Sequence, residues 1–175
     1  MRVLSMMSIM CTVSILLLTA CQKKDHEFDT PPSDWDRRFM IDATLVNRAE
    51  IYTGSIAVNR GTDVAIRAYG ARMVKEYQEA QKELEDMASK WGIHLPDEAD
   101  SAHNAMAELL LTLQGHKFDT TYIHGQQIDH EVNLNMFNKE LMWGEHVKMM
   151  AYAEKYQPYV VEHKRLADSI ANKLD

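Results

Sequence analysis

The sequence predicts an all-α protein, a four-helix bundle with one long crossover that carries a short helix. Three observations support this class. Gly and Pro are few, with 7 and 4 among 175 residues, and the chain is rich in Ala, Met, Leu, Glu and Lys, which favour helices. Apolar residues recur at spacings of three and four over long segments, which is the helical period. No segment has the alternating pattern of a strand.

The chain begins with a segment typical of a secretory leader, residues 1–20. Arg2 precedes an apolar run from Ile9 to Leu18, which fits a signal peptide and is too short for a membrane-spanning helix. The run ends in Leu-Thr-Ala-Cys, which resembles the lipobox of bacterial lipoproteins, where the cysteine becomes the lipidated first residue. We therefore expect Cys21 to anchor the mature protein in a membrane. An ordinary signal peptide with a chance cysteine is the alternative.

The residues after Cys21 predict a tether and indicate the membrane to which the protein is sorted. Residues 21–33 are mostly polar and contain two adjacent prolines, which is typical of a linker. An aspartate after the cysteine holds enterobacterial lipoproteins at the inner membrane, so Gln22 predicts an outer-membrane lipoprotein of the cell envelope. The segment QKKDHE is similar to export signals of some bacterial surface lipoproteins, so both a periplasmic and a surface-exposed position stay open.

Charge and cysteine content exclude some classes of protein. The chain has 26 acidic and 19 basic residues and a net charge of −7, and nucleic-acid binding requires clustered positive charge. Cys11 leaves with the leader, so Cys21 is the only cysteine of the mature chain and no disulfide can form within it. The expected partner is the membrane, reached through Cys21, and the sequence identifies no protein partner.

Residues 34–175 are expected to form one helical domain, which opens with two long helices. Ser33 and Asp36 resemble a capping box and predict a helix over 34–59. Gly61 ends this helix, and a second is predicted over 63–91. A tight turn joins the two, so they run antiparallel.

The middle of the domain predicts a short helix and then a long one. The short helix, 98–114, follows Pro96 and ends at Gly115. The long helix lies within residues 115–141, and Asp119 is placed as its N-cap, because a short acceptor side chain there can bind the free N–H groups of the first turn.

The last helical unit is expected to break near Pro158, since proline removes a helical hydrogen bond. Segments 145–156 and 159–174 are predicted on either side. The connection before the third long helix contains about seventeen helical residues, roughly 25 Å at 1.5 Å each, which is enough to carry the chain back along the bundle. The second and third long helices would then run parallel, as in ferritin-like folds with one long crossover.

One polar residue in each long helical unit falls at about the same height in this arrangement. Counting from the predicted helix ends puts Glu50, His130 and His163 roughly 15 Å from one end of the bundle. Tyr77 lies somewhat farther, but helical side chains lean toward their own N-terminus, which brings it closer. We therefore predict a buried polar centre formed by Glu50, Tyr77, His130 and His163.

Several segments are similar to a known bacterial family, domain of unknown function 4142. They are KEYQEAQKEL, LPDEAD, GHKFDTTYIHGQQIDHE and YQPYVVEHKRLA. The resemblance covers about residues 36–174. Members of this family are described as predicted outer-membrane or periplasmic proteins with a ferritin-like helical bundle, so the resemblance implies the same fold and compartment here.

The most specific part of the resemblance is the element from Phe118 to Tyr122 followed by His130. Pro158 and His163 fit the Leu-Pro…His ending of the family, with Gln157 in place of leucine. In the second helix the family usually carries Asp-His, whereas this chain has Glu76-Tyr77.

The polar centre has two interpretations. A structural network would bond the tyrosine and the carboxylate to the two imidazoles. Alternatively, Glu50, His130 and His163 could bind a transition metal, because carboxylate and imidazole are suitable ligands. Di-iron bundles use Glu-x-x-His pairs, and this sequence contains none, so we expect no cofactor and keep a transition metal as the alternative.

A second group of candidate ligands is Met142, His146, Met149 and Met150. Thioether and imidazole suit Cu(I), but methionines at helical spacing are more often core filler. No serine or cysteine nucleophile lies in a catalytic motif, so an enzyme is not indicated. The sequence thus favours a lipid-anchored envelope module with a binding or structural role, and the alternative is a metal-binding ferritin-like protein in stress protection.

Overall fold

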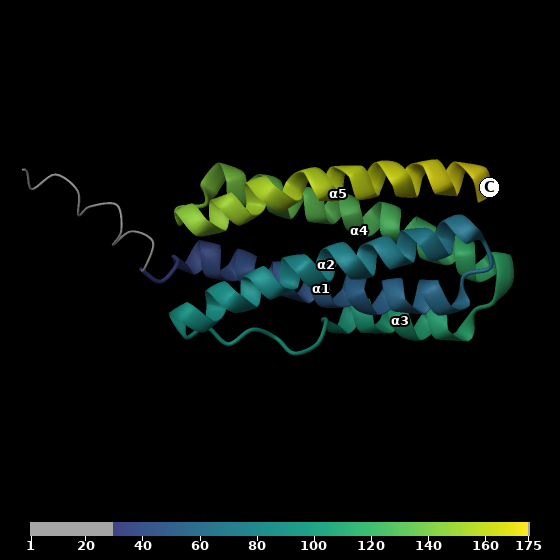
Figure 1. Ribbon diagram of the computed structural model, residues 1–175, viewed down its shortest axis with the longest axis horizontal. Coiled ribbons are helices and arrows are strands. Elements are labelled where there is room, and N and C mark those ends of the chain that lie inside the picture. Colours follow the sequence, from purple (N-terminus) through teal and green to yellow (C-terminus); the bar gives the residue numbers. More distant parts are fainter. Residues whose placement is uncertain (1–29, 175) are drawn as a thin grey trace, which may run out of the picture.

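The computed structural model describes residues 30–174 and consists of five helices (Figure 1). The helices are α1 (Asp34–Arg60), α2 (Val64–Trp91), α3 (Ser101–Thr112), α4 (Gly115–Trp143) and α5 (Val147–Leu174). Strands are absent from this described range, and the predicted all-α class is confirmed. The predicted leader 1–20, Cys21 and most of the predicted tether lie outside the described residues. No helix between residues 30 and 174 has the length and apolar character needed to cross a bilayer.

The four long helices form a bundle with one long crossover, as predicted. α1 and α2 pack together as one hairpin, and α4 and α5 form the other. Between the hairpins, the connection that contains α3 returns the chain along the bundle, so α4 runs parallel to α2 (Figure 1). α3 packs against α1 and α4 on the outside of the bundle.

The predicted break at Pro158 is wrong. The segments predicted as 145–156 and 159–174 belong to one helix, α5, with Pro158 inside it. Proline cannot donate to the carbonyl of Glu154, four residues earlier. Both residues are exposed, so water can bind this carbonyl. Buried residues on both sides of the proline, among them Tyr152 and His163, keep the two halves packed on the bundle.

The predicted N-cap at Asp119 is also wrong. α4 begins four residues earlier, at Gly115, where a φ of 61° suits a glycine. Asp119 lies buried in the second turn of α4, and its carboxylate accepts hydrogen bonds from the backbone of Thr62 and Asp63. It therefore caps the turn between α1 and α2 rather than its own helix.

Two glycines allow α1 and α2 to approach closely. A Cβ atom on Gly54 would lie 2.9 Å from the carbonyl oxygen of Gly70, and one on Gly70 would lie 2.7 Å from the carbonyl oxygen of Gly54. Any larger residue would push the helices apart, so close packing explains both glycines.

The core consists of two apolar clusters. The first lies toward the start of α1 and the end of α4, and its buried members include Phe39, Met40, Leu84, Phe137 and Tyr152. The second lies toward the α1–α2 turn, and its buried members include Ile56, Ile66, Met73, Phe118 and Ile123. Polar residues in the middle of the helices therefore face one another between two apolar regions.

Candidate functional site

All four residues of the predicted polar centre are buried, and each comes from a different long helix. Their exposed fractions are 3% for Glu50 on α1, 5% for Tyr77 on α2, 0% for His130 on α4 and 1% for His163 on α5. Burying a polar group is unfavourable unless it is paired, so the hydrogen bonds of these side chains decide what the centre can do.

Tyr77 and His130 form a direct hydrogen bond. Nδ1 of His130 lies 2.8 Å from the backbone oxygen of Gln126, and since a carbonyl only accepts, this nitrogen carries the proton. Nε2 of His130 lies 3.2 Å from the Tyr77 hydroxyl, which therefore donates to it. Burial, together with the neighbouring His163, lowers the pKa of His130 to about 3. The imidazole is neutral at physiological pH.

His163 lies beside this pair and bonds to a carboxylate. Its ring centroid is 5.3 Å from that of His130 and 5.5 Å from that of Tyr77. Its Nε2 is 2.5 Å from Oε2 of Glu76 and donates the proton, because a carboxylate oxygen accepts. Burial lowers the pKa of His163 despite the nearby carboxylate. The Nδ1 atom of His163 is buried and has no hydrogen-bond partner among the described residues.

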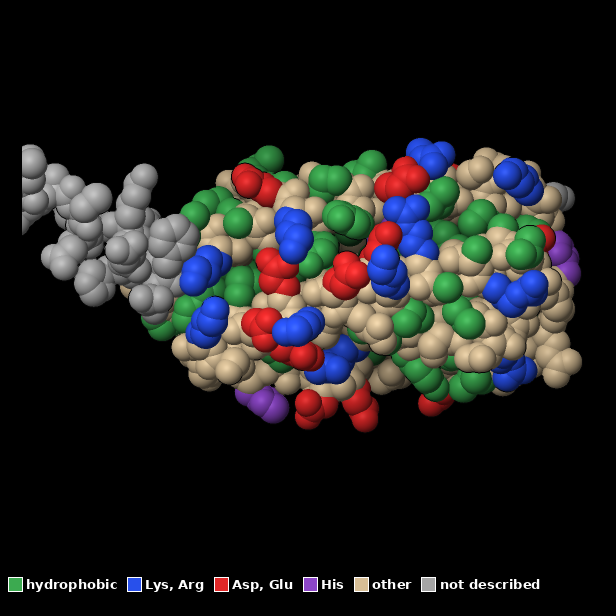
Figure 2. All heavy atoms as spheres, viewed as in Figure 1, with side chains coloured by type: hydrophobic (Ala, Val, Ile, Leu, Met, Phe, Trp, Pro, Cys, Tyr) green, Lys and Arg blue, Asp and Glu red, His purple; other side chains and the backbone are tan. Residues whose placement is uncertain are grey.

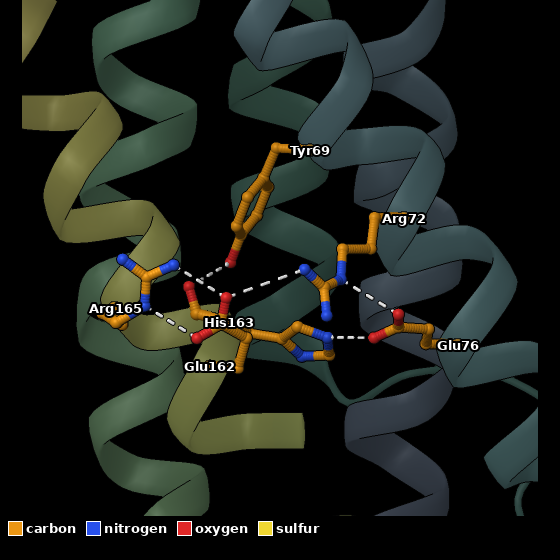
Figure 3. A network of polar contacts seen from close by, with 6 residues as sticks. All are labelled: Tyr69, Arg72, Glu76, Glu162, His163 and Arg165. Carbon is orange, nitrogen blue, oxygen red and sulfur yellow. Dashed lines mark hydrogen bonds and ion pairs between the residues drawn. The ribbon is translucent and has the colours of Figure 1, made fainter. Parts of the chain in front are cut away.

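Glu76 connects the buried centre to a charged surface network (Figure 3). Its other oxygen is 2.9 Å from Arg72 Nε, and Arg72 lies 3.9 Å from Glu162. Glu162 in turn accepts two hydrogen bonds from Arg165, of 2.7 and 2.8 Å. Glu76 was not among the predicted site residues, because it stands outside the apolar stripe of its helix. Its position in the family's Asp-His pair was the one sequence signal that pointed to it.

Glu50 occupies an adjoining part of the centre. It receives a hydrogen bond from the Gln126 side chain, but burial raises its pKa to about 8, and the charge of Asp129 acts in the same direction. The carboxyl group is therefore largely protonated at neutral pH. Its Oε2 atom and the hydroxyl of Tyr122 are buried without a partner in the part of the chain that the structure describes.

The space beside His163 is very small. A cavity of about 10 Å³ is bordered by Glu76, Tyr77, Tyr152, Tyr156 and His163. This is about the volume that one water molecule requires. The centre as it stands therefore has no room for an organic substrate.

The candidate copper ligands do not form one site. Met142 is 70% exposed, whereas Met149 is fully buried in the first apolar cluster, and Met150 is half-buried. Both ring nitrogens of His146 are used: Nε2 lies 3.0 Å from the backbone oxygen of Thr30, and Nδ1 accepts from the backbone N–H of Lys148. Within residues 30–174, no three His, Cys, Asp or Glu side chains converge closely enough to hold a metal ion.

Two further buried carboxyl groups lie close together, Asp36 at the start of α1 and Glu140 near the end of α4. Asp36 accepts hydrogen bonds from Ser33 and from the backbone N–H groups of Glu145 and His146, at 3.0 and 3.1 Å. Burial alone would raise the pKa of Asp36, but these bonds hold it below its usual value. Burial and the nearby Asp36 raise the pKa of Glu140 to about 8. Asp36 thus joins the start of α1 to the loop before α5.

Comparison with known proteins identifies the family and the fold. The family model "Domain of unknown function (DUF4142)" matches residues 21–170, and the chain belongs to this family. A solved structure, "Crystal structure of DUF305 fragment from Deinococcus radiodurans", superposes with a TM-score of 0.74 and 12% sequence identity over 82% of this chain and 99% of that one. At this identity the likeness concerns the fold alone. Comparison with curated proteins finds no match.

Proposed function

We propose that this member of the DUF4142 family is a lipid-anchored, non-catalytic module of the bacterial cell envelope, with a structural or binding role. The observation that carries this proposal is the closed polar centre. Tyr77 and His130 satisfy each other, His163 bonds to Glu76, and the adjoining cavity holds about one water. Such pairs set the register of α2, α4 and α5, because a shifted helix would break them and leave buried polar groups unpaired.

The anchoring half of the proposal is supported by the sequence around Cys21. The basic start, the short apolar run and the Leu-Thr-Ala-Cys ending agree with one another, and Gln22 favours the outer membrane. Labelling of growing cells with a fatty-acid analogue should mark the protein. Cys21→Ser should abolish the label and release the protein from the outer-membrane fraction. Labelling that survives this substitution would contradict anchoring through Cys21.

A second candidate function, metal binding in stress protection, is favoured by one observation. Each imidazole directs one N–H to an oxygen acceptor, Glu76 for His163 and the carbonyl of Gln126 for His130. Metal-binding histidines are usually oriented in this way, with the other nitrogen left for the metal. Tyr77 would have to release His130 Nε2 for both imidazoles to act as ligands.

Elemental analysis of protein purified without a His tag separates the two functions. Iron, manganese, zinc or copper at one equivalent, lost in His163→Ala but retained in His116→Ala, would favour the metal-binding protein. His116 is the matched control because it is exposed. If His130→Ala lowers the free energy of unfolding, and neither this variant nor the unsubstituted protein carries metal, the polar centre is a structural network.

A further inference from the structure

Exposed aromatic side chains gather at the end of the bundle where α1 begins and α4 ends. Trp35 is 41% exposed and Trp143 is 53% exposed. Their rings pack edge to face, with centroids 5.5 Å apart. Met142, which precedes Trp143, is 70% exposed. We call Trp35, Met142 and Trp143 the tether-end patch. A cluster of large exposed apolar side chains is typical of an interaction surface.

The patch is one unit although its residues are distant in sequence. Asp36, next to Trp35, accepts the backbone N–H groups of Glu145 and His146, which follow α4. The start of α1 and the end of α4 are therefore held together at this point. The helix ends that carry the two tryptophans are held together, so a partner would contact both side chains at once.

Basic side chains lie around the patch, together with the exposed acidic residues Asp34 and Glu145. Arg37, Arg38, Lys90 and Lys139 are exposed and lie within a few residues of the ends of α1, α2 and α4 that meet here. Arg38 and Lys139 border a groove of about 630 Å³ beside Trp35, which Asp42 and Glu140 also line. Figure 2 shows Lys and Arg side chains next to hydrophobic ones at this end. The whole protein has a net charge of −7, so this end of the bundle, where the four basic residues lie, is less acidic than the molecule as a whole.

The surface is more acidic farther along the same side of the molecule. The next hollow, between α1, α3 and α4, is lined by Asp42, Asp100 and Asp129. An anionic surface would therefore be repelled more strongly from the side of the bundle than from its end. The charge pattern therefore favours contact through the end.

We propose that the tether-end patch docks on the surface of the lipid bilayer, with Trp35 and Trp143 at headgroup depth and the basic residues next to anionic lipids. This inference rests on the proposed anchoring through Cys21. Thr30 is nine residues after Cys21 (30 − 21), at most about 32 Å of extended chain. Thr30 is held at this end of the bundle by the ring of His146, at 3.0 Å. The anchor thus brings this end to the bilayer, and tryptophan prefers the membrane interface.

The test measures tryptophan depth in the full-length protein, purified from bacterial membranes and placed in vesicles of phosphatidylethanolamine and phosphatidylglycerol. Trp91→Phe leaves Trp35 and Trp143 as the only tryptophans. Lipids brominated on their acyl chains should reduce the emission of this variant to roughly half, as expected for rings at the interface. Replacing the anionic lipid with phosphatidylcholine should weaken the quenching.

Two controls use the same vesicles. A variant with Trp35→Phe and Trp143→Phe retains only Trp91, which is half-buried and packs on His146 with ring centroids 4.7 Å apart. Val64→Trp, added to a variant in which phenylalanine replaces all three native tryptophans and keeps the patch aromatic, reports on the opposite end, where Val64 is 71% exposed. Both should keep their emission, and thermal melts should show that each variant is folded.

The outcomes separate docking from anchoring. An acylated N-terminus, verified by mass spectrometry, with unquenched Trp35 and Trp143 would overturn docking and leave the anchor intact. Quenching of an unacylated protein on addition of vesicles would support docking and remove the anchor. Equal quenching of a tryptophan at position 64 would overturn end-on contact. Unquenched tryptophans in a protein that sediments as a dimer would assign the patch to a second copy instead.

Discussion

Asp119 on α4 caps the turn between α1 and α2, with its two carboxylate oxygens 2.9 Å from the backbone nitrogens of Thr62 and Asp63. The Thr62 hydroxyl donates to the same carboxylate. A single buried side chain therefore joins the first hairpin to the helix that follows the crossover. The contact lies at the end of the bundle opposite the tether-end patch, where α4 begins.

We expect Asp119→Ala to lower the free energy of unfolding by about 3 kcal/mol, because it leaves several donors without a charged acceptor. Urea unfolding measures the change. The matched control is Asp100→Ala, which removes the N-cap of α3 at a less buried site and should cost about 1 kcal/mol. Equal losses in the two variants would show that the contact between α4 and the turn contributes no more than the N-cap of α3.

Substituting alanine for glycine should have opposite effects on stability at a packed position and at an open one. Gly70→Ala places a Cβ 2.7 Å from the carbonyl oxygen of Gly54 and should cost about 3 kcal/mol, since the packed backbones must separate. At Gly125 the nearest atom to an added Cβ is Met106 Cε, at 3.9 Å. Gly125→Ala should therefore stabilise the protein by up to about 1 kcal/mol through helix propensity. Thermal and urea unfolding of both variants check this difference. A Gly70→Ala variant as stable as the unsubstituted protein would contradict it.

Glu50 predicts a loss of stability as pH rises. The folded protein keeps the Glu50 proton up to a pKa of about 8, whereas the unfolded chain releases it near its ordinary value of 4.5. The contribution of this proton to the free energy of unfolding is complete below pH 4.5. It is lost as pH rises to about 8, by up to about 1.4 kcal/mol per pH unit. Glu50→Gln keeps a neutral side chain and should flatten this dependence. Unfolding measured between pH 5 and 8 tests it, and identical pH slopes for the two proteins would show that Glu50 is ionised when folded.

The fold was predictable because its signals are local and repeated. Helical spacing of apolar residues gave the four long helices, and the length of the segment before α4 gave the crossover. Pro158 was misinterpreted because the effect of a proline depends on solvent. At an exposed position of α5 the unpaired carbonyl can bind water, and packing on both sides maintains the helix. The sequence alone does not reveal which face of a helix a proline will occupy.

The site was predictable only where its residues follow the helical stripe. Tyr77, His130 and His163 lie on such stripes, and the structure places their rings within about 6.2 Å of one another, measured between centroids. Glu76 was missed because it approaches His163 from the edge of α2. Asp119 was given the wrong partner for a related reason: a capping side chain can serve its own helix or a distant turn, and only the fold distinguishes them.

His130 predicts a loss of stability at acid pH, opposite in direction to the effect of Glu50. Its folded pKa of about 3 lies below the ordinary value of 6.5, so the unfolded chain binds a proton that the folded protein excludes. The contribution of the neutral His130 ring to the free energy of unfolding is complete above pH 6.5. It is lost as pH falls toward 3, by up to about 1.4 kcal/mol per pH unit. His130→Gln should be less stable at neutral pH, because the bond from Tyr77 is weakened, yet its acid slope should be shallower. Exposed His116 is the control, and His116→Gln should leave the acid slope unchanged. NMR should show that the His130 ring stays neutral to below pH 5. A His130 ring that titrates near pH 6.5 would mean that the polar centre admits charge and water, and would remove the basis for a closed structural network.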